Sequence, residues 1–370
     1  MRMRVLGFMT GTSLDACDMA ILETDGQTVS AFGPAGERRL DEGLRALLVR
    51  TISEALNWPR GQAEPEIFSQ AAEAVAREHF TAGSEFLKNN GLAWRDLDLI
   101  GMHGQTVLHE RPQMGQPGRT LQLGNGEWLA RATGVPVAFD FRSADVLAGG
   151  EGAPLAPIYH LARARHSGLE APLAILNIGG VANLTAWSGG DDVVAFDTGP
   201  GNGLIDQWVH ARSGLRFDEG GRFAAQGRVD DARLQVLLNH AYFRAPAPKS
   251  LDRYDFAISD LEGLSLEDGA ATLVAFTIEA IKRGLDLTGS RPGSLIVSGG
   301  GRHNPEIMRA LHEGLPVKVQ SAEAHGWRGD ALEAEAFAFL AARTWHGLPI
   351  SFPGTTGVRT PSTGGRIAQP

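Results

Sequence analysis

The stretch GFMTGTSLDACD near the amino terminus combines the residue types of a phosphate-binding turn with two carboxylates. Gly11 would let the backbone approach a phosphate, and Thr12 and Ser13 add hydroxyl donors. The turn contains no lysine but carries Asp15 and Asp18, an arrangement that makes sense if Mg²⁺ bridges carboxylate and phosphate. The stretch predicts either a nucleotide turn with Mg²⁺ or a β-hairpin whose glycine and aspartate only make the turn.

A second carboxylate, Asp197, stands in the string FDTGPGN at the end of an expected strand. A carboxylate in this position can act as a general base beside backbone N–H groups that hold a phosphate. Asp-Thr-Gly is also the signature of aspartic proteases, but that chemistry needs two carboxylates, and the sequence has no second Asp-Thr/Ser-Gly. A purely structural turn remains the other alternative.

Two further glycine strings follow expected strands. NIGGVAN contains Gly179 and Gly180, and SGGGRHN contains Gly299 and Gly300. The second string would admit an adenine or ribose, with Asn304 capping the helix that follows. Each string alone is equally well explained as an ordinary turn.

Polar residues cluster at two other strand ends, in HGQT and in DFRSADVLAGGEGAPL. The first cluster holds His103 and Gln105. In the second, Asp140, Arg142 and Asp145 could bind sugar hydroxyls or a carboxylate, since arginine offers a two-pronged donor to an acidic substrate. The alternative is an internal Asp–Arg ion pair.

The apolar patterns predict an α/β protein that repeats one arrangement. Strands are expected at residues 4–11, 18–26 and 97–104, with helices at residues 40–56 and 64–90. Near residue 170 the pattern restarts with three strands, followed by helices at 202–214, 228–243 and 266–285, a strand at 293–301 and helices at 304–314 and 330–345. The repetition suggests two halves with a ligand cleft between them. Residues 353–370 read as a loop that returns to the first half.

Composition excludes several classes of protein. The chain has 370 residues with a net charge of −9, which does not suit a nucleic-acid or anionic-membrane surface. The single cysteine, Cys17, rules out an internal disulfide and fits a reducing cytosol. No apolar run approaches a membrane span, and the histidines lack the spacing of a zinc site.

Together these strings resemble the anhydro-N-acetylmuramic acid kinases, which belong to the superfamily of sugar kinases, Hsp70 and actin. The matching strings are GTSLDACD, HGQT, DFRSAD, GGEGAPL, NIGGVAN, FDTGPGN, APKS, SGGG with Asn304, and EAEAFAFLA; they run in family order from residue 7 to about 340. The sequence departs from the family pattern at Thr10, at Ala16, and in LDRYDF after Ser250.

The resemblance implies a duplicated ribonuclease-H-like (actin-like ATPase) α/β fold with two domains around a central cleft. The first domain is expected at residues 1–140 plus 346–370, and the second at residues 141–345. It also implies a homodimer that binds ATP, Mg²⁺ and a small sugar. The composition predicts a cytoplasmic protein that binds neither nucleic acid nor membrane.

The implied reaction has two coupled parts. Water opens the 1,6-anhydro bridge of anhydro-N-acetylmuramic acid, and the freed O6 takes the γ-phosphoryl group of ATP, as in peptidoglycan recycling. By the resemblance Asp197 activates the water, and Glu333 supports the substrate or the water from the opposite wall. Glu333 would not be singled out alone, because an acid in the first turn of a helix compensates the helix dipole.

The remaining expected roles divide into nucleotide, metal and sugar contacts. We expect Arg142 to bind the lactyl carboxylate, Asp15 and Asp18 to hold Mg²⁺, and His103, Gln105, Asp140 and Asp145 to line the sugar site with it. The residues expected to contact ATP are Gly11, Thr12, Ser13, Leu14, Asp15, Ala16, Cys17, Asp18, Gly179, Gly180, Gly199, Gly201, Asn202, Gly299, Gly300 and Asn304.

Two rival functions remain. An ordinary sugar or acetate-type kinase of the same superfamily would phosphorylate an existing hydroxyl and consume no water. An Hsp70- or actin-like module would use ATP to drive binding or assembly, but no appended peptide-binding or polymerising segment is visible in the sequence.

Overall fold

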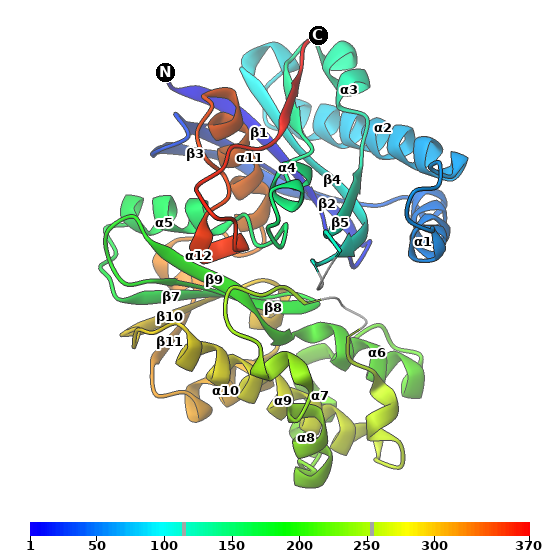
Figure 1. Cartoon of the computed structure of the whole chain (residues 1–370), viewed down its shortest axis with the longest axis vertical. Coiled ribbons are helices and arrows are strands. Elements are labelled where there is room, and N and C mark those ends of the chain that lie inside the picture. The colour runs from blue at the N-terminus through cyan, green and yellow to red at the C-terminus, as the bar shows by residue number, and fades with distance from the viewer. Residues whose placement is uncertain (113–115, 252–254) are drawn as a thin grey trace. The chain divides into compact units, whose positions relative to one another are not determined.

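The computed structural model describes residues 1–112, 116–251 and 255–370, so part of the LDRYDF departure lies outside the described residues. The chain forms two compact units, the first from Met1–Gly168 with Ala331–Pro370 and the second from Leu169–Asp330. The second unit is thus one uninterrupted segment inserted into the first (Figure 1). This division differs from the boundaries expected from sequence, because residues 141–168 and 331–345 belong with the first unit.

The first unit is built on a seven-stranded sheet in the order β12-β6-β4-β1-β2-β3, with β5 paired to β4. Its strands β1, β2 and β3 form an antiparallel meander, whereas β4 runs parallel to β1 and β6 runs parallel to β4. The strands are β1 (Met3–Thr10), β2 (Ala16–Thr24), β3 (Val29–Arg39), β4 (Leu99–Glu110), β5 (Arg119–Leu123), β6 (Val137–Phe139) and β12 (Arg366–Ala368).

Helices cover both faces of this sheet. They are α1 (Glu42–Asn57), α2 (Glu66–Asn89), α3 (Gly126–Thr133), α4 (Ser143–Leu147), α5 (Pro157–His166), α11 (Leu332–Trp345) and α12 (Pro353–Thr356). Figure 1 shows α1 and α2 on one side of the sheet and α11 on the other.

Strand β1 is apolar almost throughout because both of its faces are buried. Phe8 faces α2, where its ring stacks on His79 with 4.8 Å between the ring centroids. Gly7 faces α11, and a Cβ at this position would lie 2.0 Å from the Ala334 carbonyl oxygen. The close approach of α11 to the sheet therefore requires glycine at position 7.

The second unit repeats the same strand order in a five-stranded sheet, β11-β10-β7-β8-β9. Its strands are β7 (Leu173–Ile178), β8 (Val181–Trp187), β9 (Val193–Pro200), β10 (Ser294–Ser298) and β11 (Lys318–Ser321). Strands β7, β8 and β9 are antiparallel neighbours, while β10 lies parallel to β7 and β11 parallel to β10. This is the arrangement of β1, β2, β3, β4 and β6, so the predicted duplicated ribonuclease-H-like α/β fold is confirmed.

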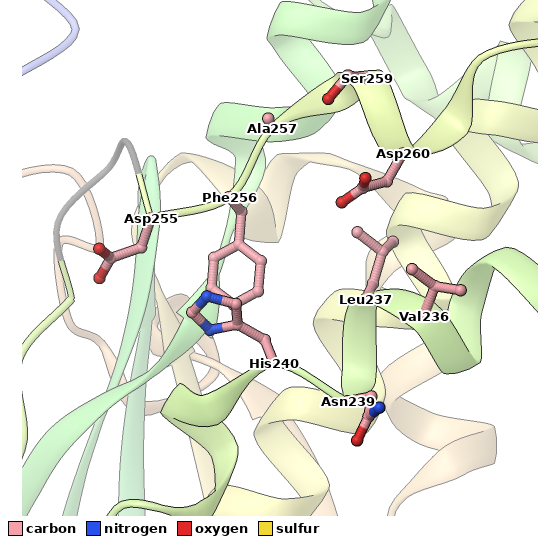
Figure 2. A pocket seen from close by; sticks show the side chains of 9 residues that line it. All are labelled: Val236, Leu237, Asn239, His240, Asp255, Phe256, Ala257, Ser259 and Asp260. Carbon is pink, nitrogen blue, oxygen red and sulfur yellow. The ribbon is translucent and has the colours of Figure 1, made fainter.

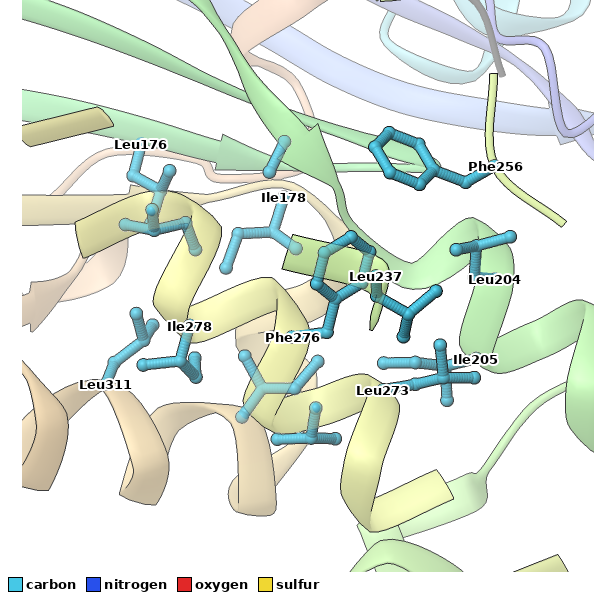
Figure 3. Packing of buried hydrophobic residues seen from close by; sticks show 14 of the residues in the cluster. Leu176, Ile178, Leu204, Ile205, Leu237, Phe256, Leu273, Phe276, Ile278 and Leu311 are labelled. Atoms are coloured by element: carbon cyan, nitrogen blue, oxygen red, sulfur yellow. The ribbon is translucent and has the colours of Figure 1, made fainter. Parts of the chain in front are cut away.

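The core of the second unit forms where its long central helix packs on the sheet. The helices are α6 (Asn202–Ser213), α7 (Arg222–Gln226), α8 (Asp231–Leu238), α9 (Leu266–Leu287) and α10 (Pro305–Gly314). Figure 3 shows Phe276 and Ile278 of α9 among Ile178 of β7, Leu204 of α6 and Leu311 of α10. All members of this buried cluster lie within the second unit, which therefore has a hydrophobic core of its own.

Some elements differ from the sequence-based expectation. Helix α5 was not predicted, because it is buried on most sides, Tyr159 and Arg163 included, and so lacks an amphipathic stripe. The expected helix at 228–243 is helical only over α8 before a 3₁₀ turn at Ala241–Arg244. The expected C-terminal loop contains α12 and β12, which pairs with β6.

None of the described helices combines the length and the apolar character needed to cross a membrane.

Candidate functional site

The turn between β1 and β2 is held in place by an internal hydrogen bond and by two hydrogen bonds with β4. The Leu14 N–H donates to the Gly11 carbonyl at 3.2 Å, and Gln105 Nε2 donates to the same carbonyl at 3.3 Å. The Thr10 hydroxyl donates to the Gly104 carbonyl at 3.1 Å. The glycine turn predicted from sequence is thus tied directly to the HGQT segment. Gln105 is fully buried, so its side chain supports the turn from the protein interior.

Only part of the predicted nucleotide turn is accessible. Thr12, Ser13 and Asp15 are exposed, whereas Leu14 and Cys17 are buried. Burial raises the pKa of the Cys17 thiol well above its ordinary value, so the thiol stays protonated. Any contact from Leu14 or Cys17 to a nucleotide would therefore have to come from the backbone.

Three glycine segments of the second unit meet at one edge of its sheet. Strands β7, β9 and β10 run in the same direction, so their carboxyl ends share that edge. The Asn202 N–H donates to the Gly179 carbonyl at 2.7 Å, and the Gly203 N–H donates to the Gly180 carbonyl at 3.1 Å. The carboxyl edge of parallel strands is where α/β folds bind ligands.

The close packing of these segments requires glycine. A Cβ at Gly201 would lie 2.3 Å from the Gly179 carbonyl oxygen, and one at Gly301 would lie 2.4 Å from Ile178 Cγ2. Asn304 caps α10 as predicted, because its Oδ1 accepts from the Glu306 N–H at 3.0 Å and the Ile307 N–H at 3.3 Å. The structure therefore brings together the predicted residues Gly179, Gly180, Gly199, Gly201, Asn202, Gly299 and Gly300 at this edge, with Asn304 at the helix start beyond them.

A buried arginine anchors the third glycine segment. Arg302 donates to both carboxylate oxygens of Asp330 at 2.7 Å, to Glu323 Oε1 at 2.8 Å and to the Gly299 carbonyl at 2.8 Å. A guanidinium with this many partners holds one geometry. Sequence reasoning did not single out Arg302, although it directly follows the glycine triplet.

Asp197 lies on β9 next to a β-bulge. Ala182 of β8 pairs with Gly199 while Asn183 pairs with Asp197, so Thr198 is an extra residue in β9. Bulges of this kind re-aim neighbouring side chains. The Asp197 side chain is largely buried at 9% exposure, and its Oδ2 accepts from the Leu251 N–H at 2.8 Å.

The APKS segment holds the backbone on which Asp197 is mounted. The Asp197 N–H donates to the Lys249 carbonyl at 3.0 Å, and the Tyr242 hydroxyl donates to the Asp197 carbonyl. Buried Lys249 in turn donates to the carbonyls of Tyr242 at 3.0 Å and Ala245 at 3.2 Å. The sequence contained APKS as a motif, but its contact with Asp197 could be seen only in three dimensions.

Two asparagines that sequence reasoning passed over lie in a row with Asp197. Asn177 of β7 pairs with Asn183 of β8, and Asn183 pairs with Asp197 of β9. Residues paired directly across strands share a face of the sheet, and both asparagines are half-buried. The string NIGGVAN contains both Asn177 and Asn183 beside its two glycines, so the signal was present in the sequence.

His103 positions a cation in the first unit. Arg142 Nε–H donates to His103 Nε2 at 3.1 Å, so that nitrogen must be unprotonated, and the opposite Nδ1–H donates to the Gly104 carbonyl at 2.7 Å. Burial lowers the pKa of His103 well below its ordinary value, and the Arg142 charge lowers it further. His103 is therefore a neutral acceptor that orients Arg142, and it is itself only 4% exposed.

Arg142 is half-buried and held on two sides. Besides His103, its NH1 donates to the Gly152 carbonyl at 2.8 Å. Its guanidinium carbon lies 6.0 Å from the centre of the Phe337 ring. A guanidinium fixed in this way is preorganised to bind a carboxylate.

Asp140 and Asp145, predicted together with Arg142, have different partners. Asp140 lies 3.8 Å from Arg366 Nε and is partly exposed. Asp145 is buried, and its carboxylate accepts from the Gly152 N–H at 2.6 Å and from the Thr356 hydroxyl at 2.5 Å. Both oxygens of Asp145 are thus engaged inside the protein.

Glu333 lies in the first turn of α11, in the same unit as Arg142. Its side chain is exposed to solvent. Desolvation by the surrounding protein nevertheless raises the pKa of Glu333, and the charge of Arg142 lowers it in part. Glu335, two residues further, is fully buried and accepts from the Tyr159 hydroxyl, so the two glutamates lie in different environments.

A separate shallow pocket of about 290 Å³ lies in the second unit, beside the carboxyl end of α8 (Figure 2). His240, Asp255, Phe256 and Asp260 are among its lining residues. Figure 2 shows the His240 and Phe256 rings against one another, with 4.6 Å between their centroids. None of the residues predicted from sequence to bind nucleotide or sugar lines this pocket.

The repeated strand order, with glycine segments at the carboxyl ends of β7, β9 and β10, defines the actin-like ATPase class of α/β proteins, which includes sugar kinases. Residues 3–370 match the family of anhydro-N-acetylmuramic acid kinases, and the chain belongs to this family. It is therefore a phosphotransferase.

Relatives of the same description span the whole chain. The chain is 66% identical over 368 residues to the anhydro-N-acetylmuramic acid kinase of Phenylobacterium zucineum, covering 100% of both proteins. It is 64% identical to the kinase of Caulobacter vibrioides, covering 99% of this chain and 98% of the relative. Among solved structures, the chain is similar to component A of the (R)-2-hydroxyglutaryl-CoA dehydratase of Acidaminococcus fermentans, with 14% identity and a TM-score of 0.47. The match covers 92% of this chain and 99% of that protein. That similarity is too low to transfer function.

Proposed function

We propose that the protein uses ATP and water to convert 1,6-anhydro-N-acetylmuramic acid into N-acetylmuramic acid 6-phosphate and ADP, a step of peptidoglycan recycling. Membership of the kinase family supports the substrate. The observation that carries the chemistry is Asp197, a largely buried carboxylate at a bulge beside the meeting point of the glycine segments. Its Oδ2 already accepts a backbone N–H, which leaves its orientation fixed.

In the proposed reaction Asp197 is the general base. Water attacks the anomeric carbon and gives a proton to the carboxylate, and the bond from that carbon to the bridging oxygen breaks. The freed O6 attacks the γ-phosphorus of ATP, whose bond to the β–γ bridging oxygen breaks as ADP leaves. The Leu251 N–H and the APKS backbone keep the carboxylate in place, because proton transfer depends on its geometry.

We assign the phosphates of ATP to the glycine segments at the carboxyl ends of β7, β9 and β10. Phosphoryl transfer depends on positioning and charge neutralisation, which backbone N–H groups supply at low conformational cost. The glycines at positions 179, 180, 201 and 299–301 keep side chains away from that edge of the sheet.

Mg²⁺ would complete the nucleotide site. Among the described residues no three His, Cys, Asp or Glu side chains converge as a metal site. Mg²⁺ in kinases takes one or two carboxylates together with waters and phosphates, and the exposed Asp15 with the half-buried Asp18 fits that need. These two residues would hold the ion, which neutralises phosphate charge when bound.

The sugar's lactyl carboxylate is assigned to Arg142. The His103 and Gly152 contacts fix the guanidinium, and neutral His103 adds no competing charge. Glu333, whose raised pKa favours its protonated form more than usual, is assigned to the sugar or the attacking water.

A labelling experiment tests the reaction. The enzyme is incubated with ATP, Mg²⁺ and 1,6-anhydro-N-acetylmuramic acid in ¹⁸O-water, and the product is analysed at once by mass spectrometry. We expect a 6-phosphate sugar with one ¹⁸O at the anomeric position. Asp197→Asn should abolish it, while Asp192→Asn, an exposed acid just before the same strand, should not.

Other outcomes of this experiment separate the proposal from its nearest rival. ADP release without the labelled product would reject the hydrolytic step. Phosphorylation of ring-opened N-acetylmuramic acid as fast as of the anhydro form would favour an ordinary sugar kinase.

We further propose that the enzyme is a cytoplasmic homodimer. Light scattering of the purified protein across a concentration series tests the dimer, and cell fractionation tests the location. A monomer mass at all concentrations would reject the first proposal.

A further inference from the structure

The sugar-side residue Arg142 is connected to the C-terminal part of the chain through one buried carboxylate. Asp145 Oδ1 accepts from the Thr356 hydroxyl at 2.5 Å, and Asp145 Oδ2 accepts from the Gly152 N–H at 2.6 Å. The carbonyl of the same Gly152 accepts from Arg142 NH1 at 2.8 Å. A continuous series of three hydrogen bonds thus runs from Thr356 to the guanidinium.

Thr356 makes a second contact with the same loop. Its carbonyl accepts from the Glu151 N–H at 2.7 Å, next to Gly152. Thr356 has no exposed surface, and Asp145 is 1% exposed. The hydrogen bond from the Thr356 hydroxyl to Asp145 is therefore shielded from water, and no solvent molecule replaces it if the hydroxyl is lost.

The loop has little freedom apart from these contacts. A Cβ at Gly150 would lie 2.3 Å from Asp145 Oδ2, and one at Gly152 would lie 2.7 Å from Val146 Cγ2. The loop is packed onto the carboxylate of Asp145, so the position of that carboxylate sets the position of the Gly152 carbonyl.

We infer that Thr356 is a positioning residue for the sugar site: through Asp145 and Gly152 it holds Arg142 in the orientation that binds the substrate's carboxylate. The inference rests on the proposed function for the identity of the substrate. The inference also changes the role of Asp145, which was predicted to line the sugar site. Its buried carboxylate instead holds the loop that contains Gly152, and Gly152 contacts Arg142. The short C-terminal helix α12 thereby becomes part of the substrate-binding apparatus.

The chain supplies a matched control in the neighbouring residue. Thr355 lies in the same helix and is equally buried, but its hydroxyl donates only to the local Phe352 carbonyl at 3.3 Å. Thr356→Val and Thr355→Val are the same substitution one position apart. Thr356→Ser retains the hydroxyl and should restore wild-type behaviour.

The first measurement is the KM for each substrate. Thr356→Val should raise the KM for the anhydro sugar roughly 10-fold, as expected for loss of a hydrogen bond to a charged group, with the KM for ATP within about 2-fold of wild type. Thr355→Val and Thr356→Ser should stay near wild type. In an Arg142→Ala background, Thr356→Val should add no further change, because its effect passes through Arg142. An equal effect of both valine variants, or a full effect without Arg142, would overturn the inference.

Hydrogen exchange provides a readout independent of activity. Thr356→Val should speed amide exchange in residues 149–152, and Thr355→Val should not. Unchanged exchange in this loop would reject the hydrogen-bonded connection. If wild type does not act on the anhydro sugar, the proposed function fails, while the exchange result still decides the connection. Asp145→Asn tests the same connection if Thr356→Val does not fold.

Discussion

We predict that Arg142 is the residue on which binding of the proposed acidic sugar depends most. Arg142→Ala should raise the KM for the anhydro sugar about 10- to 100-fold, the usual value of a charge-assisted hydrogen bond, and leave the KM for ATP nearly unchanged. Steady-state kinetics with each substrate varied in turn measures this split. Arg131→Ala, an exposed arginine of the same unit, is the control. An unchanged sugar KM would remove Arg142 from the site.

His79 makes the first unit sensitive to acid. The ring is fully buried against Phe8, and neither of its nitrogens has a hydrogen-bond partner among the described residues. Burial lowers its pKa from the ordinary 6.5 to about 3. The unfolded chain therefore binds a proton on His79 near pH 6.5, whereas the folded chain binds it only near pH 3. The contribution of neutral His79 to the free energy of unfolding is complete above pH 6.5 and is lost as the pH falls through this range.

We predict that His79→Leu reduces this acid sensitivity. The loss attributable to His79 between pH 7 and pH 4 is of the order of 3 kcal/mol, and denaturant unfolding at several pH values measures it. Parallel curves for wild type and His79→Leu would contradict the assignment.

At the scale of single residues, the sequence predicted candidate side chains but not the residues that contact them. Asp197 and Arg142 were both predicted, but the role of Asp145 depends on Thr356, which lies 211 residues away in sequence. No local pattern reports a contact at that separation. Asn177 and Asn183 could have been recognised as neighbours of Asp197, because strand pairing alone places them in register with it.

At the scale of the elements, the glycine segments depend on close backbone packing. Gly201→Ala should lower the free energy of unfolding by about 1–3 kcal/mol, because its Cβ would meet the Gly179 carbonyl oxygen at 2.3 Å. Gly180→Ala is the control for stability, as nothing lies within 4 Å of a Cβ there. Thermal unfolding of both variants measures the difference. Equal melting temperatures would show that the segments can move apart.

The same elements show why their order was predictable and their limits were not. Strands β7, β8 and β9 were recognisable because apolar runs end in glycines, and α9 begins at residue 266 as predicted. Helix α5 and the short elements α12 and β12 were missed because tertiary packing, and not an amphipathic pattern, stabilises them.

At the scale of the molecule, we predict that the two units differ in their independence. Residues 169–330 form one segment whose buried cluster is complete within it, so this fragment should unfold cooperatively on its own. Residues 1–168 lack α11, whose absence exposes the sheet face at Gly7 and Gly101. That fragment should be aggregated or unfolded by circular dichroism and gel filtration.

Joining residues 1–168 to residues 331–370 through a flexible linker should restore a folded first unit. If residues 1–168 alone melt at the same temperature as this joined form, α11 is not needed to complete the sheet, and the prediction is wrong.

Because the second unit interrupts the first in sequence, the two parts of the first unit are synthesised at different times. The ribosome makes β1 to α5 first, then all of the second unit, and only then α11. At about 5–20 residues per second, the nascent first sheet waits roughly 10–30 s with one apolar face bare. During that interval the chain is at its most vulnerable to aggregation, and a chaperone would have its clearest target in the strip that α11 later covers.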